Sequence, residues 1–264
     1  MKMFDDKKVA IALVGNFRYL RKNFDRLFNQ LRGVGEYKGE IILITTYFCP
    51  TFLINNLSKK NNIKIFRFRQ IKFNKKTEYL LNNLNTGIEP NRNKTKKFQW
   101  HKVHIFDIKF KEWDYIFYLD LNIHIHHSLQ PLFKIYPNRN IYARSDSYPD
   151  YERTLESQFD TTNVLYKKLK SEFDTNINNY FQTCILYFDT NIINEYSKSE
   201  IIDLVNKYPI SITNEQGIMN LYFIFKEENY NELPLKMDGY ITFYYWLLKN
   251  EKVILSKQNR TQYK

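Results

Sequence analysis

The segment DYIFYLDLNIHIHH, residues 114–127, is the most informative part of this chain. Five mostly apolar residues at 115–119 lead directly into Asp120, Leu121 and Asn122. A short apolar run bounded by polar residues is typical of a strand that is buried on both faces, as in a parallel sheet. Open α/β sheets bind ligands at the carboxyl ends of such strands, so we expect Asp120 to lie at a ligand site.

Asp120 and Asn122 have the spacing of two ligands on one face of an extended chain. With Leu121 pointing away, both side chains project to the same side. An acid-x-acid pair in this position can hold a divalent cation through oxygen ligands, although here the second acid is an amide. A turn is the alternative interpretation, because Asp and Asn both bond to nearby backbone. The motif alone leaves a cation or diphosphate site and a turn equally open.

Three histidines, His124, His126 and His127, follow this motif. If the strand continued, His124 and His126 would share a face with Asp120, which could suit zinc. No cysteine or further histidine is close in sequence to complete a tetrahedral site, so we interpret them as surface or supporting residues. A Gly-rich phosphate loop, a Ser-His-Asp triad and a Cys-His pair are all absent from the sequence.

The composition is that of a globular protein with a sizeable core. Hydrophobic residues make up 43% of the chain, with 21 Tyr and 21 Phe but only 7 Gly and 7 Pro. Cys49 and Cys184 form no disulfide pattern, which favours a reducing compartment. No apolar run reaches the ~20 residues of a membrane span, and the N-terminus lacks a signal-peptide pattern. We therefore expect a soluble protein in the cytoplasm or another intracellular compartment.

Strand and helix patterns alternate along the chain. We predict strands over 8–14, 40–46, 63–68, 115–119 and 181–188. We predict helices over 19–31, 98–110, 162–171, 194–207 and 214–226, and a helix followed by a mobile basic loop over 74–97. This order indicates an α/β fold. We expect one domain over 1–264, divided by the turn-rich segment 145–152 into halves of about 1–145 and 146–264.

The net charge of +12 is concentrated between Lys59 and Lys102, where thirteen lysines and arginines face two acids. Such a segment points to a polyanionic partner, which could be nucleic acid, membrane headgroups or the phosphates of a nucleotide, or it forms a solvated basic surface. A nucleic-acid-binding protein is therefore one hypothesis. Its stacking platforms would be Phe66, Phe68, Phe73 and Tyr79. That hypothesis leaves the strand ending in Asp120 without a purpose.

Three further segments place polar residues at the ends of predicted elements. They are FQWHKVHIF (98–106) with Lys102, YFQTCILYFDT (180–190) with Gln182, and TNEQGIMNLYF (213–223) with Glu215 and Gln216. Thr213 or Asn214 is the expected N-cap of the last helix. Each segment taken alone has a structural explanation.

Together, in this order and spacing, the segments resemble the GT-A glycosyltransferases. The resemblance is to the group that holds glycogenin, galactinol synthase and the bacterial lipopolysaccharide galactosyltransferases. That group has an apolar strand, Asp-x-Asp and a run ending in Leu-x-Pro-Leu-Phe, which YLDLNIHIHHSLQPLF (118–133) matches except at Asn122. Weaker likenesses join its Thr-Lys-Leu-His, Phe-Asn-Ser-Gly and Asp-Gln-x-x-x-Asn motifs to residues 100–104, 181–184 and 215–220. The resemblance spans about residues 8–225.

The resemblance implies a GT-A-like domain with a Rossmann-like mixed central sheet flanked by helices. It implies a hexosyltransferase that moves a sugar, with retention, from a nucleotide-diphosphate sugar to a glycan, protein or small-molecule acceptor; a UDP-sugar is the first candidate. The donor would be bound by Val14, Gly15, Asn16, Arg18, Lys102, Asp120 and Asn122. Asp120 and Asn122 would also hold a divalent cation, Mn or Mg. The catalytic residues would be Gln182, Glu215 and Gln216 at the sugar.

The chain departs from this family at the metal site. The second acid is Asn122, and the family's late metal-binding histidine has no counterpart after residue 127. Three hypotheses follow: a weak cation site completed by water, a catalytically weak pseudo-glycosyltransferase, or replacement of the cation by Lys102, Lys257 or Arg260. The aromatic residues at 240–246 could stack on sugar rings, but we favour packing in the core.

Overall fold

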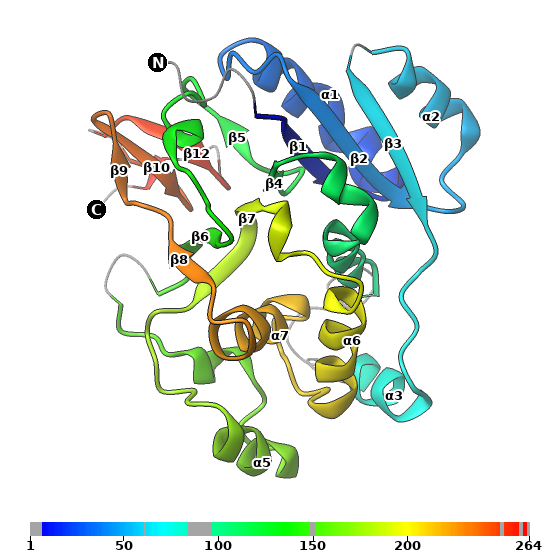
Figure 1. The fold of residues 1–264 in the computed structure, drawn as a ribbon, viewed down its shortest axis with the longest axis vertical. Helices are drawn as coiled ribbons and strands as arrows, with labels where there is room; N and C mark the ends of the chain where they lie inside the picture. Colours follow the sequence, from blue (N-terminus) through cyan, green and yellow to red (C-terminus); the bar gives the residue numbers. More distant parts are fainter. Residues whose placement is uncertain are drawn as a thin grey trace.

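The computed structural model describes residues 7–60, 62–83, 97–147, 151–248, 251–258 and 261–262. Its centre is a seven-stranded sheet with the order β3-β2-β1-β4-β7-β6-β8 (Figure 1). The strands are β1 (Val9–Val14), β2 (Glu40–Thr46), β3 (Ile63–Phe68), β4 (Tyr115–Leu119), β6 (Ile141–Ser145), β7 (Phe181–Asp189) and β8 (Tyr230–Glu232). Only β7 runs antiparallel to its neighbours in this sheet. The mixed α/β fold and all five predicted strands are therefore confirmed.

The helix α1 (Phe17–Arg32) covers one face of the sheet. The Asn16 side chain caps it by accepting a hydrogen bond of 3.0 Å from the Tyr19 amide. Its buried residues recur every three or four positions and are Leu20, Phe24, Leu27 and Leu31. They pack with Ile11 and Leu13 of β1, whereas Ala10 and Ala12 enter the core on the opposite face. This alternation explains why the strands are apolar at every position.

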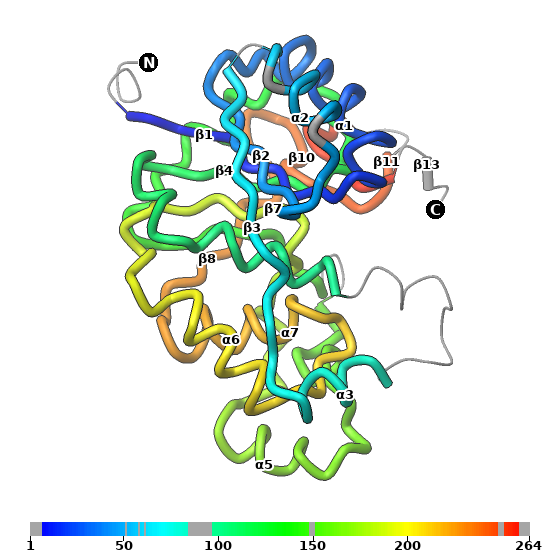
Figure 2. Tube along the Cα trace, turned by 90° about the vertical axis from the view of Figure 1, so that its right-hand side faces the viewer, coloured from blue at the N-terminus to red at the C-terminus, as the bar shows by residue number. Residues whose placement is uncertain are grey.

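The opposite face is covered mainly by segments from the second half of the chain. Figure 2 shows α1 and α2 (Thr51–Ser58) on one side of the strands and α6 (Ser197–Lys207) and α7 (Glu215–Asn220) on the other. The remaining helical segments are α3 (Lys75–Asn83), α5 (Val164–Glu172), η3 (Leu132–Lys134), η4 (Leu155–Gln158), η5 (Thr190–Ile192) and the π-helix η6 (Leu221–Lys226). The helix α2 has no counterpart among the predictions. The predicted basic loop lies largely within 84–96, outside the described residues.

The predicted helix over 98–110 differs from the observed structure. The chain forms two 3₁₀ segments, η1 (Trp100–Phe106) and η2 (Ile108–Glu112), separated at Asp107. Asp107 has extended backbone (φ −75°, ψ 139°), and its side chain accepts a hydrogen bond from the Lys109 amide. All seven residues of η1 are buried, so packing on the sheet rather than helix propensity sets its conformation. Lys102 lies in the middle of this buried segment.

The C-terminal part forms a second sheet that weak periodicity did not reveal. Its order is β5-β12-β10-β9, with β5 (His124–Ile125), β9 (Lys236–Met237), β10 (Tyr240–Tyr244) and β12 (Val253–Ser256). A two-stranded sheet pairs β11 (Leu247–Leu248) with β13 (Thr261–Gln262). Because β5 follows the Asp120 motif directly, its pairing with β12 places residues 253–256 beside the end of β4.

Within the part of the chain that the structure describes, no helix is both long enough and apolar enough to cross a membrane.

Candidate active site

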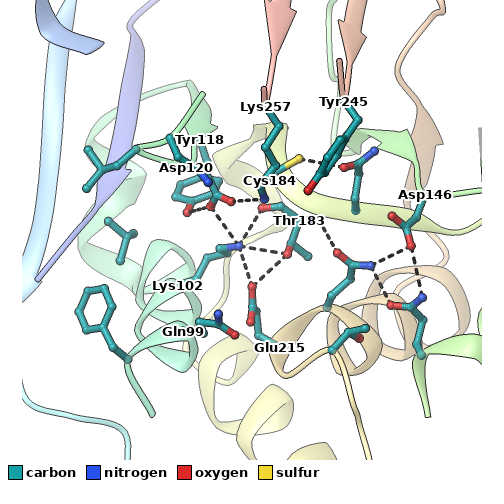
Figure 3. A pocket seen from close by; sticks show the side chains of 18 of the residues that line it. Gln99, Lys102, Tyr118, Asp120, Asp146, Thr183, Cys184, Glu215, Tyr245 and Lys257 are labelled. Atoms are coloured by element: carbon teal, nitrogen blue, oxygen red, sulfur yellow. Dashed lines mark hydrogen bonds and ion pairs between the residues drawn. The ribbon is translucent and has the colours of Figure 1, made fainter. Parts of the chain in front are cut away.

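A cavity of about 430 Å³ lies where β1, β4 and β6 end and β7 begins. These ends meet at one edge because β7 runs antiparallel to β4 and β6. The volume is within the range of small-molecule sites. The lining includes Val14, Tyr19, Lys102, Asp120, Asn122, Asp146, Gln182, Thr183, Glu215, Gln216, Tyr245 and Lys257. Figure 3 shows how several of these side chains converge.

Asp120 is the centre of a hydrogen-bonded cluster at this edge. Its Oδ1 accepts a hydrogen bond of 2.6 Å from the Tyr118 hydroxyl and lies 3.3 Å from Lys102 Nζ. Its Oδ2 accepts a hydrogen bond of 3.1 Å from Lys257 Nζ. Burial acts to raise the pKa of Asp120, but the two lysines outweigh it and lower the pKa to about 2. The carboxylate is therefore charged at neutral pH and engaged through both oxygens.

The Asp-x-Asn motif is also a turn. The Ile123 amide donates to the Asp120 carbonyl at 3.0 Å, and Arg26 of α1 donates to the carbonyls of Leu121 and Ile123. The turn interpretation of the motif is therefore confirmed, and the side chains of Asp120 and Asn122 also border the cavity. The Asn122 side chain lines that cavity and makes no hydrogen bond within the described residues.

Lys102 is fully engaged by its neighbours. Its ammonium group donates to the carbonyl and hydroxyl of Thr183, both at 3.0 Å, and to Glu215 Oε1 at 2.6 Å. These bonds use all three of its N–H donors. Burial acts to lower the pKa of Lys102, but Asp120 and Glu215 outweigh it and raise the pKa. Lys102 therefore ties η1, β4, β7 and α7 together at the cavity.

Lys257 follows β12 and reaches the same carboxylate from the C-terminal sheet. Its side chain is 24% exposed, compared with 9% for Lys102. Burial acts to lower the pKa of Lys257, but the negative charge of Asp120 raises it overall. Its hydrogen bond to Asp120 joins residues that are 137 positions apart in the chain. Arg260, the other late basic candidate, lies outside the described residues.

A row of amides forms the other side of the cavity, where Figure 3 labels Asp146. Gln216 Nε2 donates to Gln158 Oε1 at 2.8 Å and to Asp146 Oδ2 at 3.2 Å. Gln182 Nε2 donates to the Ser145 carbonyl at 3.4 Å. The sequence did not single out Asp146 or Gln158. Asp146 carries the same signal as Asp120, a polar residue just after a strand, but its segment was interpreted as a boundary.

Glu215 begins α7 beside Lys102 and also accepts a hydrogen bond of 3.0 Å from the Thr183 hydroxyl. Asn214 is the N-cap of α7, as expected, but its side chain makes no cap hydrogen bond and donates instead to Gln99 Oε1. Asn214 has φ 58°, a left-handed conformation that Asn tolerates better than most residues. This turn of the backbone precedes the buried carboxylate of Glu215.

Most residues named from the sequence meet at the cavity, and three do not. The lining contains Val14, Lys102, Asp120, Asn122, Gln182, Glu215 and Gln216. Asn16 serves as the cap of α1, and Arg18 is exposed and is not one of the lining residues. Gly15 leaves room for Leu121 and Leu20, since an added Cβ would overlap both side chains. Gly15 and Asn16 thus have structural explanations.

The divalent cation implied by the resemblance does not fit these residues. Both oxygens of Asp120 already contact ammonium groups, and Asn122 offers a neutral amide, which is a weaker ligand. The described ranges contain no group of three or more His, Cys, Asp and Glu residues that could hold a metal. A divalent ion at Asp120 would also be repelled by the two lysines.

The histidines after the motif contact the C-terminal sheet and α1. His126 Nε2 lies 2.8 Å from Ser256 Oγ, and His124 Nδ1 lies 3.3 Å from Arg26 Nη1. Burial, followed by the charge of Arg26, lowers the pKa of His124 to about 4. These contacts agree with a supporting role, as expected.

The basic segment does not present the predicted stacking row. Phe68 is buried against His104, and Phe66 and Phe73 pack edge-on against Phe110 and Trp100. Tyr79 is the exposed member of the four, at 69%. Three basic residues of the segment between Lys59 and Lys102 lie outside the described residues: Arg92, Lys94 and Lys96. The aromatic side chains thus give little support to nucleic-acid stacking.

The aromatic residues near the C-terminus behave largely as expected. Phe243 and Tyr244 are buried in the second sheet, which confirms core packing for them. Tyr245 is 41% exposed and lines the cavity, so it is available to contact a ligand.

No family model matches this chain, and no curated protein does either. Solved glycosyltransferases are nevertheless similar in structure. The bifunctional glycosyltransferase WbbM superposes with a TM-score of 0.58 and 14% identity over 97% of this chain, which spans only 46% of WbbM. The galactosyltransferase LgtC, solved with donor and acceptor sugar analogs, gives a TM-score of 0.58 and 12% identity, covering 86% of this chain and 73% of its own. Mouse xyloside xylosyltransferase 1 gives a TM-score of 0.54 and 10% identity, covering 96% of this chain and 97% of its own.

At sequence identities of 10–14%, the structural similarity shows the fold alone. The order of the mixed sheet and the helices on its two faces agree with the expectation drawn from the sequence motifs. The chain has the GT-A fold of glycosyltransferases, and its resemblance to the lipopolysaccharide galactosyltransferase group is confirmed at the level of structure.

Proposed function

We propose that this protein is a glycosyltransferase that uses a nucleotide-diphosphate sugar, with a UDP-sugar as the first candidate. The observation that carries the proposal is the polar cavity at the strand ends of a GT-A fold, bordered by a charged Asp120–lysine cluster and a row of amides. A likeness to LgtC, which was solved with donor and acceptor sugar analogs, supports the same conclusion.

The three parts of the donor have chemically suitable surroundings along the cavity. Val14, Tyr19 and Phe98 provide apolar contacts for the base. The diphosphate would lie at the cationic side, beside Asp120 and Lys257. The sugar hydroxyls would meet Gln182, Gln216 and Asp146, which offer amide donors and carboxylate acceptors. We assign the acceptor, a glycan, a protein or a small molecule, to the side that the second half of the chain contributes.

The cavity supports transfer without a covalent enzyme intermediate. The Cys184 thiol is a poor nucleophile because burial raises its pKa to about 12. Glu215 is held by Lys102 and Thr183. In the retaining reaction we propose, the bond between the anomeric carbon and the diphosphate oxygen breaks, and the acceptor oxygen bonds to that carbon on the same face. The acceptor proton passes to the leaving diphosphate, so the protein contributes positioning and charge neutralisation.

A thermal-shift series with UDP-, GDP- and CMP-sugars tests the proposal. Ligand at about 100 times its Kd stabilises a folded protein by about 2.7 kcal/mol, which raises Tm by roughly 5–10 °C at this size. We expect one nucleotide class to give this shift and Asp120→Ala to abolish it. The matched control Asp25→Ala removes an exposed carboxylate that pairs with Lys60 and should leave the shift unchanged.

Transfer and donor hydrolysis are then measured with the nucleotide that binds. Binding without either reaction would identify a pseudo-glycosyltransferase. No shift with any nucleotide sugar, together with oligonucleotide binding that collapses steeply with salt, would replace the proposal with the nucleic-acid hypothesis.

A further inference from the structure

We infer that the Lys257 ammonium group takes the place of the divalent cation and neutralises the diphosphate of the donor. The inference rests on the proposed function and deepens it. It follows from a contrast between the two lysines that share Asp120, because their free hydrogen-bonding capacity differs.

Lys102 has no donor left for a ligand. Its three N–H groups are directed to two oxygens of Thr183 and to Glu215, and its side chain is 9% exposed. A diphosphate could recruit Lys102 only by breaking this buried arrangement. Lys102 therefore holds Asp120 and Glu215 in place rather than binding the ligand.

Lys257 keeps donors for a ligand. Within the described residues, its ammonium group makes one hydrogen bond, to Asp120 Oδ2, which leaves two N–H groups unused. Its side chain is 24% exposed and lines the cavity. An ammonium group anchored by one carboxylate can bind phosphate oxygens as a point charge.

The backbone on either side of Lys257 is fixed. Ser256 pairs with His124 in the β12–β5 ladder, and its hydroxyl donates to the Gln258 carbonyl at 2.7 Å. The preceding residue, Leu255, pairs with Ile125 and is buried. The pairing of β12 with β5 thus places Lys257 at the end of β4. Little ordering of its backbone is needed when a ligand binds.

Asp120, which Lys257 contacts, belongs to the motif that would hold a metal ion, and this motif lacks its second acid. Asn122 is a neutral amide, and the carboxylate of Asp120 is directed at two ammonium groups. A cation at Asp120 would have to share the carboxylate with two ammonium groups, whose positive charge opposes its binding. The residues therefore suit a fixed organic cation at the diphosphate better than a bound metal ion.

Calorimetric titration with UDP, in EDTA and in MnCl₂, tests the inference. We expect wild-type Kd values that agree within about threefold in the two buffers. Lys257→Met should weaken UDP binding by roughly 10- to 100-fold in both, the effect of losing a charged hydrogen bond, and Lys257→Arg should retain part of the affinity. The matched control Lys252→Met removes an exposed lysine that precedes β12 and should bind UDP like the wild type.

The outcomes separate this inference from the proposed function. Wild-type affinity that is at least tenfold higher in MnCl₂ than in EDTA would overturn the inference, and so would Lys257→Met binding UDP as tightly as the wild type. If Lys257→Met does not fold, the same UDP titration of Lys257→Gln tests the inference, together with the comparison of wild-type Kd values in EDTA and in MnCl₂. If UDP, GDP and CDP fail to bind in either buffer, the proposed function itself is wrong.

Discussion

The two sides of the cavity reach the same carboxylate by different routes. On one side, Lys102 and Glu215 are held by β4, β7 and two buried helical segments that pack directly on the central sheet. On the other, Lys257 arrives from a short strand of the C-terminal sheet and is more exposed. In the roles we propose, Lys102 on the buried side holds Asp120 and Glu215 in place, whereas Lys257 on the C-terminal side binds the ligand.

Lys102→Met should give the largest loss of stability, and comparison with Lys257→Met tests the different roles of the two lysines. Removing one partner of a buried ion pair leaves the other charge uncompensated, which costs about 3–5 kcal/mol. Lys257→Met should cost less, about 1.5–3 kcal/mol, because Asp120 keeps Tyr118 and Lys102 as partners. Urea denaturation measures both free energies of unfolding. Equal losses, or a larger loss for Lys257→Met, would contradict the division of roles between the two lysines.

The same contrast explains what the sequence could predict. The strand at 115–119, Lys102 within the apolar segment 98–106 and Glu215 at the start of a helix all lie in elements with a clear local pattern. Each segment alone has a structural explanation, and only the resemblance of their order and spacing to the GT-A motifs led us to expect that these residues lie together.

The C-terminal side has no comparable local signal. β5 has two residues and β12 has four, and their pairing depends on contacts between distant parts of the chain. Lys257 could therefore be named from the sequence only as one of three candidate cations. Arg26, which fixes the Asp120 turn, lies on the polar side of α1 and gave no sign of that role.

Acid denaturation should sharpen the contrast through Asp120 itself. Its folded pKa of about 2 lies below its ordinary value of 3.8, so its pairing stabilises the fold fully above pH 4. That contribution, about 2 kcal/mol, is lost as the pH falls from about 4 through 2. Asp120→Asn should therefore lose less stability than the wild type over this range. Unfolding free energies at several pH values test this, and parallel pH profiles for the two proteins would show that the lysines do not hold the carboxylate.

Gly15→Ala tests the close packing beneath the motif. A Cβ at residue 15 would overlap Leu121 and lie 2.7 Å from Leu20 Cδ2, so both side chains must move to accommodate it. Overpacking of this kind costs about 1–3 kcal/mol. UDP affinity should fall as well, because Leu121 belongs to the turn that carries Asp120 and Asn122.

Leu121→Ala provides the matched background for this last substitution. If Gly15 is required because of Leu121, adding Gly15→Ala to Leu121→Ala should cost less than it does in the wild type, with a coupling energy of about 0.5–3 kcal/mol. Residual cost would come from Leu20, which is buried on the other side of residue 15. Additive losses would mean that Gly15 acts through something other than the room it leaves for the turn.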